Sequence, residues 1–307
     1  MKAARIHHFG PPDAITIDEV PAPVPGHRDV LVRVAASGVG PWDALIREGK
    51  SKVSPRPPLT LGSDLSGVVE AVGPDVAAFA IGDELYGVTN PQFVGANAQF
   101  ALAGVDMIAA KLPQLTHVEA ASLPVVAVTA WQMLFEYANV VAGQKVLILG
   151  AAGSVGSYAV QMAVGAGLHV IAVASSRDTG YVRGLGAESC FDFRSTDGAN
   201  EVPQVDAILD MVGGATLQKS LRYVTRGGIV VSVYSPESLP QSRDVRAVFF
   251  YVEVTTARLN AISELLRQGK LRVNVGTVLP LGRIREAHQM LAGAPHPRGK
   301  IVLTTGS

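Results

Sequence analysis

The sequence predicts an α/β protein with a doubly wound parallel sheet of six strands and a second, smaller, mostly β domain. Three observations predict this fold. A continuous apolar run stands directly before a glycine-rich turn, strand-like and helix-like segments alternate from Lys145 onward, and the first 114 residues are rich in Gly, Pro and short Val-rich runs without that alternation. Alternating strands and helices are typical of a parallel sheet covered by helices on both faces.

The glycine-rich turn is the feature around which the chain is organised. Val146–Leu149 is apolar throughout, as expected for a strand buried on both faces. Gly150–Gly156 follows at once, and Ser157–Ala166 then contains few helix breakers. Strand, glycine turn and helix in this order predict a dinucleotide site in which a pyrophosphate binds at the helix N-terminus. The spacing is GxxGxxG rather than the common GxGxxG, and the alternative is a turn whose small residues only allow close helix packing.

The end of the second strand predicts which dinucleotide is bound. Leu168–Ala174 is a second buried strand and ends in Ser175, Ser176 and Arg177, whereas the first acidic residue is Asp178. An NAD site would place Asp or Glu at this strand end to bind the ribose hydroxyl. Two hydroxyls and a guanidinium instead suit a 2′-phosphate, so we expect NADP(H). The alternative is an ordinary polar turn with a solvated Arg.

The remaining segments define the domain organisation that we expect. Residues 1–120 form the mostly β domain, residues 121–254 the nucleotide-binding domain, and residues 255–307 return to the β domain. The β domain contains strands near Asp29–Ala36, Gly67–Val72 and Asp83–Val88, with a helical turn at Trp42–Glu48. The sheet strands are expected near residues 146–149, 169–174, 189–193, 205–210, 229–233 and 247–252, and the tail contributes helices at 255–269 and 284–291 and a strand at 300–303.

Composition excludes several classes of protein. The 307 residues include 26 basic and 26 acidic ones, so nothing indicates a nucleic-acid-binding or polybasic membrane surface. Cys190 is the only cysteine, which excludes an internal disulfide framework and favours a reducing, cytoplasmic location. No signal peptide is apparent. Val146–Ser176 lacks charged residues, but its glycines favour a buried βαβ unit over a membrane span.

Several further motifs carry a family resemblance. They are ASGVGPWD at 36–43, LGSDLSG at 61–67, GDELYG at 82–87, the glycine turn, FFYVE at 249–253 and GKIVL at 299–303. With these motifs the chain resembles the zinc-independent quinone oxidoreductase branch of the medium-chain dehydrogenase/reductase superfamily over nearly its whole length. The resemblance implies a Rossmann sheet and a GroES-like catalytic domain.

The resemblance also bears on metal binding. Catalytic zinc in the related alcohol dehydrogenases is held by two Cys and one His. The corresponding positions here are Gly40, the Ser63-Asp64 pair and Val125, which supply no competent ligand set. We therefore expect no metal. Without a Lewis acid the expected reaction is hydride transfer from NADPH to a small-molecule quinone or activated α,β-unsaturated carbonyl. An enoyl thioester reductase and a non-catalytic NADPH-binding redox sensor remain alternatives.

The resemblance implies a set of site residues. Gly40, Trp42, Asp64 and Tyr86 are expected to line the substrate pocket, and Phe93 is a further candidate. The alternative is that the aromatic side chains belong to the hydrophobic core. Asp64 is either a proton donor or a buried carboxylate bonded to the backbone or an Arg. Gly40 and Leu45 stand where many relatives have the polar residues Asn and Tyr. The expected cofactor contacts are Thr129, Ala152, Gly153, Ser154, Val155, Ser175, Ser176, Arg177, Phe193, Val233, Tyr234, Ser235, Phe250, Val252 and Lys300.

Two of these expectations carry their own alternatives. Phe193 lacks the hydroxyl of the Tyr that relatives often place near the adenosine phosphate, and Lys300 could equally be a surface lysine. The apolar run Phe249–Val254 is expected to be the last strand at the sheet edge, where it would pair with a second copy to give a homodimer. The alternative is an edge covered by the chain's own tail.

Overall fold

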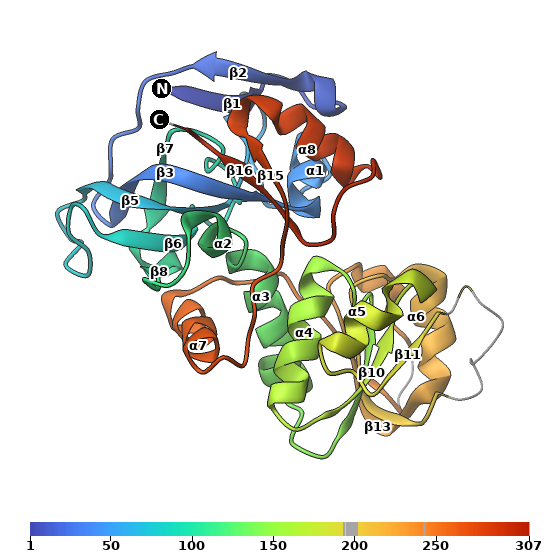
Figure 1. Ribbon diagram of the computed structural model, residues 1–307. Coiled ribbons are helices and arrows are strands. Elements are labelled where there is room, and N and C mark those ends of the chain that lie inside the picture. The colour runs from blue at the N-terminus through green and yellow to red at the C-terminus, as the bar shows by residue number, and fades with distance from the viewer. Residues whose placement is uncertain (193, 195–201, 242–243, 307) are drawn as a thin grey trace. The chain divides into compact units, whose positions relative to one another are not determined.

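The computed structural model describes residues 1–192, 194, 202–241 and 244–306, and the chain divides into two compact units (Figure 1). Unit 1 comprises residues 1–125, 254–263 and 273–307, and unit 2 comprises residues 126–253 and 264–272. Helix α7, Thr256–Arg267, begins in unit 1 and ends in unit 2.

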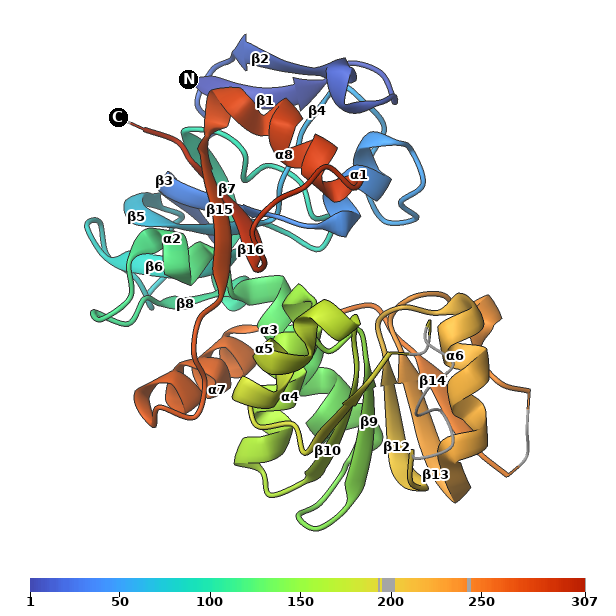
Figure 2. The ribbon, with the colours of Figure 1, turned by 45° about the vertical axis from the view of Figure 1, so that its right-hand side comes forward.

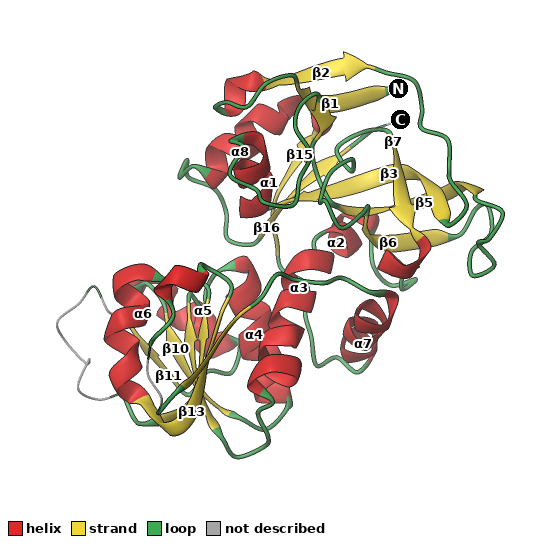
Figure 3. Cartoon of the chain, turned by 180° about the vertical axis from the view of Figure 1, so that it is seen from behind, coloured by secondary structure: helices red, strands yellow, loops and turns green. Residues whose placement is uncertain are grey.

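Unit 1 is dominated by strands, drawn in yellow in Figure 3. A mixed sheet has the order β15-β16-β3-β5-β6-β8, with β7 paired to β3, and a small second sheet has the order β2-β1-β4. The strands are β1 Lys2–Ile6, β2 Ile15–Glu19, β3 Asp29–Val39, β4 Leu59–Thr60, β5 Asp64–Val72, β6 Glu84–Val88, β7 Phe100–Gly104, β8 Ile108–Ala110, β15 Val275–Pro280 and β16 Lys300–Thr304. The helices are α1 Pro41–Arg47, α2 His117–Ala121 and α8 Ile284–Leu291.

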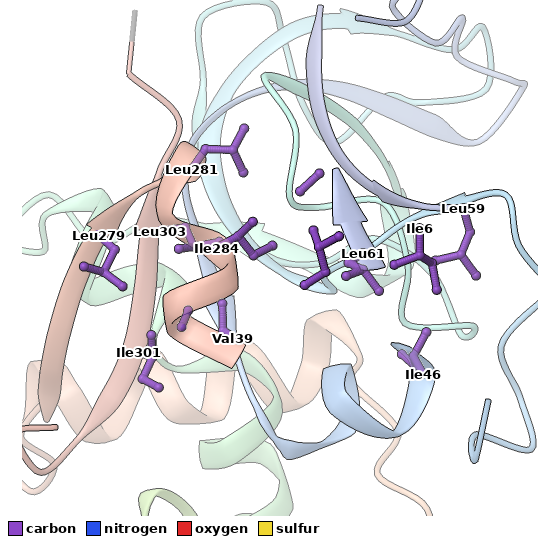
Figure 4. Packing of buried hydrophobic residues seen from close by; sticks show 13 residues of the cluster. Ile6, Val39, Ile46, Leu59, Leu61, Leu279, Leu281, Ile284, Ile301 and Leu303 are labelled. Carbon is purple, nitrogen blue, oxygen red and sulfur yellow. The ribbon is translucent and has the colours of Figure 1, made fainter. Parts of the chain in front are cut away.

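The tail of the chain completes the large sheet of unit 1. Strand β16 pairs antiparallel with β3, and its Ile301 lies opposite Val39. The core beside this pairing, shown in Figure 4, combines Val39, Leu61, Ile301 and Leu303 with Ile284 of α8. Burial of such side chains is the main favourable term in folding, so the last strand and the first domain stabilise each other.

Unit 2 contains the predicted doubly wound sheet. Its six strands have the order β11-β10-β9-β12-β13-β14, and every neighbouring pair is parallel. In Figure 2, α4 and α5 lie on one side of this sheet and α6 on the other. The elements are β9 Lys145–Leu149, α4 Ser154–Gly165, β10 His169–Val173, α5 Thr179–Gly184, β11 Ser189–Phe191, β12 Val205–Asp210, α6 Gly214–Ser220, β13 Val224–Ser232 and β14 Arg246–Phe249. The predicted fold class is confirmed.

A π-helix follows α3 and organises the end of the sheet. Pro124 begins α3, Pro124–Trp131, because Pro is well tolerated in the first turn of a helix. The next turn, Gln132–Ala138, has π geometry, in which residues five apart are bonded and face the same side. Gln132 Oε1 accepts the Glu253 N–H at 3.0 Å, and the Tyr137 ring stacks on Phe250 with centroids 4.3 Å apart.

These two contacts explain a difference from the predicted strand. The sequence predicts a last strand over Ala247–Val252, but β14 ends at Phe249. Phe250 and Glu253 are held by the π-helix instead, so the chain leaves the sheet before Val252. The apolar pattern alone could not distinguish side chains packed in a sheet from one stacked on a helix.

The buried amide of Gln132 provides a test of this arrangement. Gln132→Met keeps the length of the side chain but removes the acceptor for the Glu253 N–H, and the loss of a typical hydrogen bond costs about 0.5–1.5 kcal/mol. We expect that loss in urea unfolding followed by circular dichroism.

The matched control is Gln268→Met at an exposed position directly after α7, which should change stability by less than about 0.5 kcal/mol. Equal, small effects of both substitutions would show that the hydrogen bond to Glu253 does not hold the segment.

Candidate active site

The glycine turn in unit 2 has the geometry that close approach of a ligand requires. Gly150 has a φ of +80°, and a Cβ added at Gly156 would lie 2.2 Å from the Gly150 carbonyl oxygen. Helix α4 begins at Ser154, and no side chain of the Gly153 cap accepts its first N–H groups. These donors and the positive end of the helix dipole favour an anion. Ala152–Val155, the predicted pyrophosphate contacts, lie at this position.

The strand end after β10 contains the residues predicted for the 2′-phosphate. The Arg177 side chain is 87% exposed and lies 3.8 Å from Asp178. The Ser176 N–H and hydroxyl donate to one oxygen of Asp192, at 2.8 and 2.9 Å. Arg194 donates to the same carboxylate from Nε and Nη2. These hydrogen bonds hold the pKa of Asp192 well below its usual range.

Sequence reasoning missed Asp192 and Arg194. Asp192 lies 16 residues beyond Ser176 and comes beside it because β11 pairs in parallel with β10. Asp192 lies within the strand predicted near residues 189–193, which was the available signal. Phe193, the predicted adenosine contact, lies outside the described residues. At this strand end Ser175 and the exposed Arg177 are available to a ligand, whereas the N–H and hydroxyl of Ser176 are bonded to Asp192.

The segments predicted to contact a nicotinamide also have defined positions in unit 2. Thr129 is buried on α3, and Val233 and Val252 are half-buried. Tyr234 is 60% exposed; a Cβ at Gly213 would lie 2.1 Å from its ring, so Gly213 accommodates the ring. The Ser235 hydroxyl donates to Glu237. The Phe250 ring is buried against Tyr137, so this residue can offer a ligand its backbone but not its ring.

A buried ion pair occupies the centre of the candidate residues in unit 1. Lys300 Nζ lies 2.9 Å from Asp64 Oδ2, and the two side chains are 2% and 0% exposed. The contact is an ion pair without the geometry of a directed hydrogen bond. Asp64 Oδ1 accepts the Val125 N–H at 3.0 Å. Burial raises the pKa of Asp64, and Lys300 opposes that effect. The surface-lysine alternative for Lys300 is therefore wrong, and Asp64 is a buried carboxylate bonded to the backbone and to a lysine.

Trp42 covers this ion pair. Lys300 Nζ lies 4.0 Å from the centroid of the indole, and the indole Nε1–H donates to Ser63 Oγ at 3.0 Å. The indole also takes the space beside Gly40, where an added Cβ would come within 2.3 Å of the ring. The structure thus brings Gly40, Trp42 and Asp64 of the predicted pocket residues together.

Asp43 is a buried acid that sequence reasoning did not select. It is 0% exposed, and its Oδ2 accepts the Gly40 N–H at 2.8 Å, while Oδ1 has no hydrogen-bond partner among the described residues. Burial raises the pKa of Asp43 to about 7, against the opposing effect of the Gly40 N–H and of Lys300. Asp43 therefore fixes the backbone at Gly40 and titrates near neutral pH.

Tyr86 and Phe93 differ from the predicted lining of a pocket. The Tyr86 ring is fully buried, and its hydroxyl donates to the Leu259 carbonyl oxygen at 2.7 Å and lies 2.9 Å from Ser263 Oγ. Tyr86 thus joins β6 to α7, and its predicted place in an open pocket is corrected. Phe93 packs against the hydrophobic cluster around Leu61. The exposed Leu45 remains on the outer side of α1.

The described residues meet neither the requirements of a metal site nor those of a membrane-spanning helix. No group of three or more His, Cys, Asp or Glu side chains among them could hold a metal ion. Gly40 has no side chain, Ser63 is bonded to Trp42, and Asp64 is paired with Lys300. These residues do not fit a zinc ion. Within the described part of the chain no helix is both long and apolar enough to cross a bilayer.

A doubly wound nucleotide-binding unit and a strand-rich unit completed by the C-terminal strand define an alcohol dehydrogenase-like protein of two domains. The family model described as an alcohol dehydrogenase GroES-like domain matches residues 26–112, and that of a zinc-binding dehydrogenase matches residues 185–303. The chain is 31% identical to the quinone oxidoreductase of Homo sapiens, over 99% of this chain and 97% of that protein.

Solved structures agree with these matches. The quinone oxidoreductase of Coxiella burnetii superposes with a TM-score of 0.93 at 32% identity, covering 100% of this chain and 99% of that one. A mycobacterial protein complexed with NADPH gives 0.89 at 26% identity, covering 99% and 100%. The chain belongs to the medium-chain dehydrogenase/reductase superfamily and, within it, to the quinone oxidoreductases, a family of oxidoreductases.

The titration of Asp43 predicts a pH dependence of stability. Its pKa of about 7 lies above the usual 3.8, so between pH 4 and 7 the folded chain keeps a proton that the unfolded chain has released. Stability therefore falls as pH rises through this window. Asp43→Asn removes the titration, and we expect its stability relative to the unchanged protein to rise by about 2 kcal/mol between pH 5 and pH 8.

Urea unfolding midpoints at the two pH values measure this difference. Asp106→Asn, at an exposed acid of unit 1, is the control and should give the same difference at both pH values. If Asp43→Asn behaves like that control, Asp43 is ionised throughout and the assignment is wrong.

Proposed function

We propose that this protein is a zinc-independent, NADPH-dependent oxidoreductase that transfers hydride to a quinone or an activated α,β-unsaturated carbonyl. The observation that carries the proposal is the glycine turn of unit 2, whose uncapped α4 offers N–H donors to a pyrophosphate. Membership of the quinone oxidoreductase family supports the acceptor class.

The choice of NADPH over NADH rests on the strand end after β10. Arg177 is 87% exposed and its Nε makes only a long ion pair with Asp178 at 3.8 Å, and Ser175 lies on the same strand end. Arg194 forms an ion pair with Asp192, so the negative charge of that carboxylate is neutralised beside the strand end. A guanidinium matches the geometry of a phosphate, which favours a 2′-phosphate over a ribose hydroxyl. The solved relative complexed with NADPH supports the same choice.

The proposed mechanism assigns limited roles to this chain's residues. A bound nicotinamide supplies the hydride. The N-terminus of α4 binds the phosphates, and Gln132 and Tyr137 fix the Phe250–Val252 segment as a backbone wall. Asp64 is held by Lys300 and the Val125 N–H, so it is not free to donate a proton. The proton that completes reduction of the acceptor therefore comes from water in this proposal.

We further infer a homodimer in the cytoplasm. Strand β14 pairs only with β13 among the described strands and so leaves one sheet edge open in this chain. Tyr251, next to that edge, is 59% exposed. Unpaired edges invite pairing with a second copy. We expect light scattering at micromolar concentration to give twice the chain mass of 32.1 kDa, and a monomeric mass would refute the dimer.

The first experiment follows the oxidation of NADPH or NADH, with a small quinone as acceptor, by the decrease in nicotinamide absorbance. We expect rapid oxidation of NADPH, much slower oxidation of NADH and no effect of prior treatment with a zinc chelator. Binding of NADPH without turnover of quinones or of aliphatic enones would favour an enoyl thioester reductase or a redox sensor instead.

The cofactor preference has its own variant in this assay. Arg177→Ala should weaken the binding of NADPH by about tenfold or more and leave the binding of NADH nearly unchanged. Tenfold corresponds to about 1.4 kcal/mol, which a charge-assisted hydrogen bond can supply. Arg183→Ala, at an exposed position of α5, is the matched control. Equal losses for NADPH and NADH in Arg177→Ala would contradict the 2′-phosphate assignment.

A further inference from the structure

We propose that the indole of Trp42 is the wall that the acceptor meets in unit 1, and that it seals the Lys300–Asp64 ion pair so that the site selects planar, uncharged acceptors. This inference deepens the proposed function and rests on it. It names the substrate class, a neutral quinone ring, from the way in which three neighbouring groups hold one aromatic side chain.

The Trp42 ring occupies the space beside Gly40. A Cβ at position 40 would lie 2.3 Å from two atoms of the Trp42 ring and 2.6 Å from a third. Atoms this close must move apart, so a side chain at position 40 would displace the outer end of the indole from its present place. Trp42 thus fills the side-chain space that glycine leaves open at position 40. The wall at this position is an aromatic ring instead of a polar side chain from residue 40.

Two contacts define the orientation of the ring. The Nε1–H is turned toward Ser63, which is fully buried, and one face of the ring lies against Lys300 Nζ. Asp64 and Lys300 are buried, whereas Trp42 itself is only partly buried. The polar edge and the ammonium thus lie on the inner side of the indole, and the part that reaches solvent is apolar.

The charges beneath the indole balance each other. Asp64 neutralises Lys300, and the electron-rich face of the indole further stabilises the ammonium. Neither charge of this ion pair is free to pair with a charged acceptor while the indole is in place. An electron-poor quinone ring can pack on the exposed part of the indole, since aromatic rings attract one another in offset or edge arrangements. A neutral planar acceptor is therefore the class that this wall fits.

Steady-state kinetics with two acceptors of the same ring system test the inference. The probes are 1,4-naphthoquinone and its 2-sulfonate, each with saturating NADPH. Trp42→Ala uncovers the ammonium, so kcat/KM for the neutral quinone should fall about tenfold or more and the ratio of neutral to anionic kcat/KM should fall by a similar factor. Trp42→Phe keeps an aromatic cover and should hold that ratio within about threefold of the unchanged protein.

A ratio that stays the same in Trp42→Ala, while the unchanged protein reduces both quinones, overturns the inference and leaves the proposed function intact. Trp131→Phe is the matched control, because Trp131 lies on α3 in contact with Phe135 and contributes no group to the Lys300–Asp64 ion pair. It should leave the ratio unchanged.

Fluorescence separates failure of the inference from failure of the proposed function, because it needs no turnover. The chain contains two tryptophans, so Trp131→Phe reports on Trp42 alone and Trp42→Phe reports on Trp131 alone. Saturable quenching by 1,4-naphthoquinone should be stronger when only Trp42 remains. Such quenching without NADPH oxidation would support the wall and refute the oxidoreductase, whereas equal or stronger quenching of Trp131 overturns the inference.

Discussion

The buried Lys300–Asp64 ion pair is the interaction on which unit 1 depends. It joins the last strand, β16, to the start of β5, and through the Val125 N–H to the start of α3. Two charges in a protein interior are costly to desolvate, and removing one partner of such a pair typically costs 3–5 kcal/mol because the other is left uncompensated. The C-terminal strand must therefore dock for Asp64 to be accommodated.

The same pair determines what surrounds it. The Trp42 indole lies over Lys300 in space that Gly40 leaves open, and Asp43 accepts the Gly40 N–H and so holds that backbone in place. Ser63 accepts the indole N–H and is thereby engaged within the protein. Residues that stand at the zinc-ligand positions of related dehydrogenases are thus committed to one internal network. Their polar groups are therefore engaged within the protein.

Much of the fold follows from local sequence. The apolar run before Gly150 fixes β9, the spacing of apolar residues fixes α8, and β12 has its predicted bounds, because each depends on neighbours in the chain. Contacts between distant residues could not be predicted in this way. Asp192 reaches Ser176 across two strands, Tyr86 bonds to a helix that begins 170 residues later, and Lys300 is buried by partners near the start of the chain. Local pattern gives the type of an element, whereas pairing decides what its polar groups contact.

The two proposed sites depend on this distinction to different degrees. The proposed pyrophosphate site needs only backbone groups of one strand, one turn and one helix, all within 12 consecutive residues from Lys145 to Gly156. The acceptor wall proposed here requires residues 40, 42, 63, 64 and 300 together, and it depends on a glycine that is informative only once the indole beside it is seen. A missing side chain is therefore evidence about a site when a neighbour occupies its space. At Gly40 the space of the absent side chain is filled by the aromatic ring of Trp42.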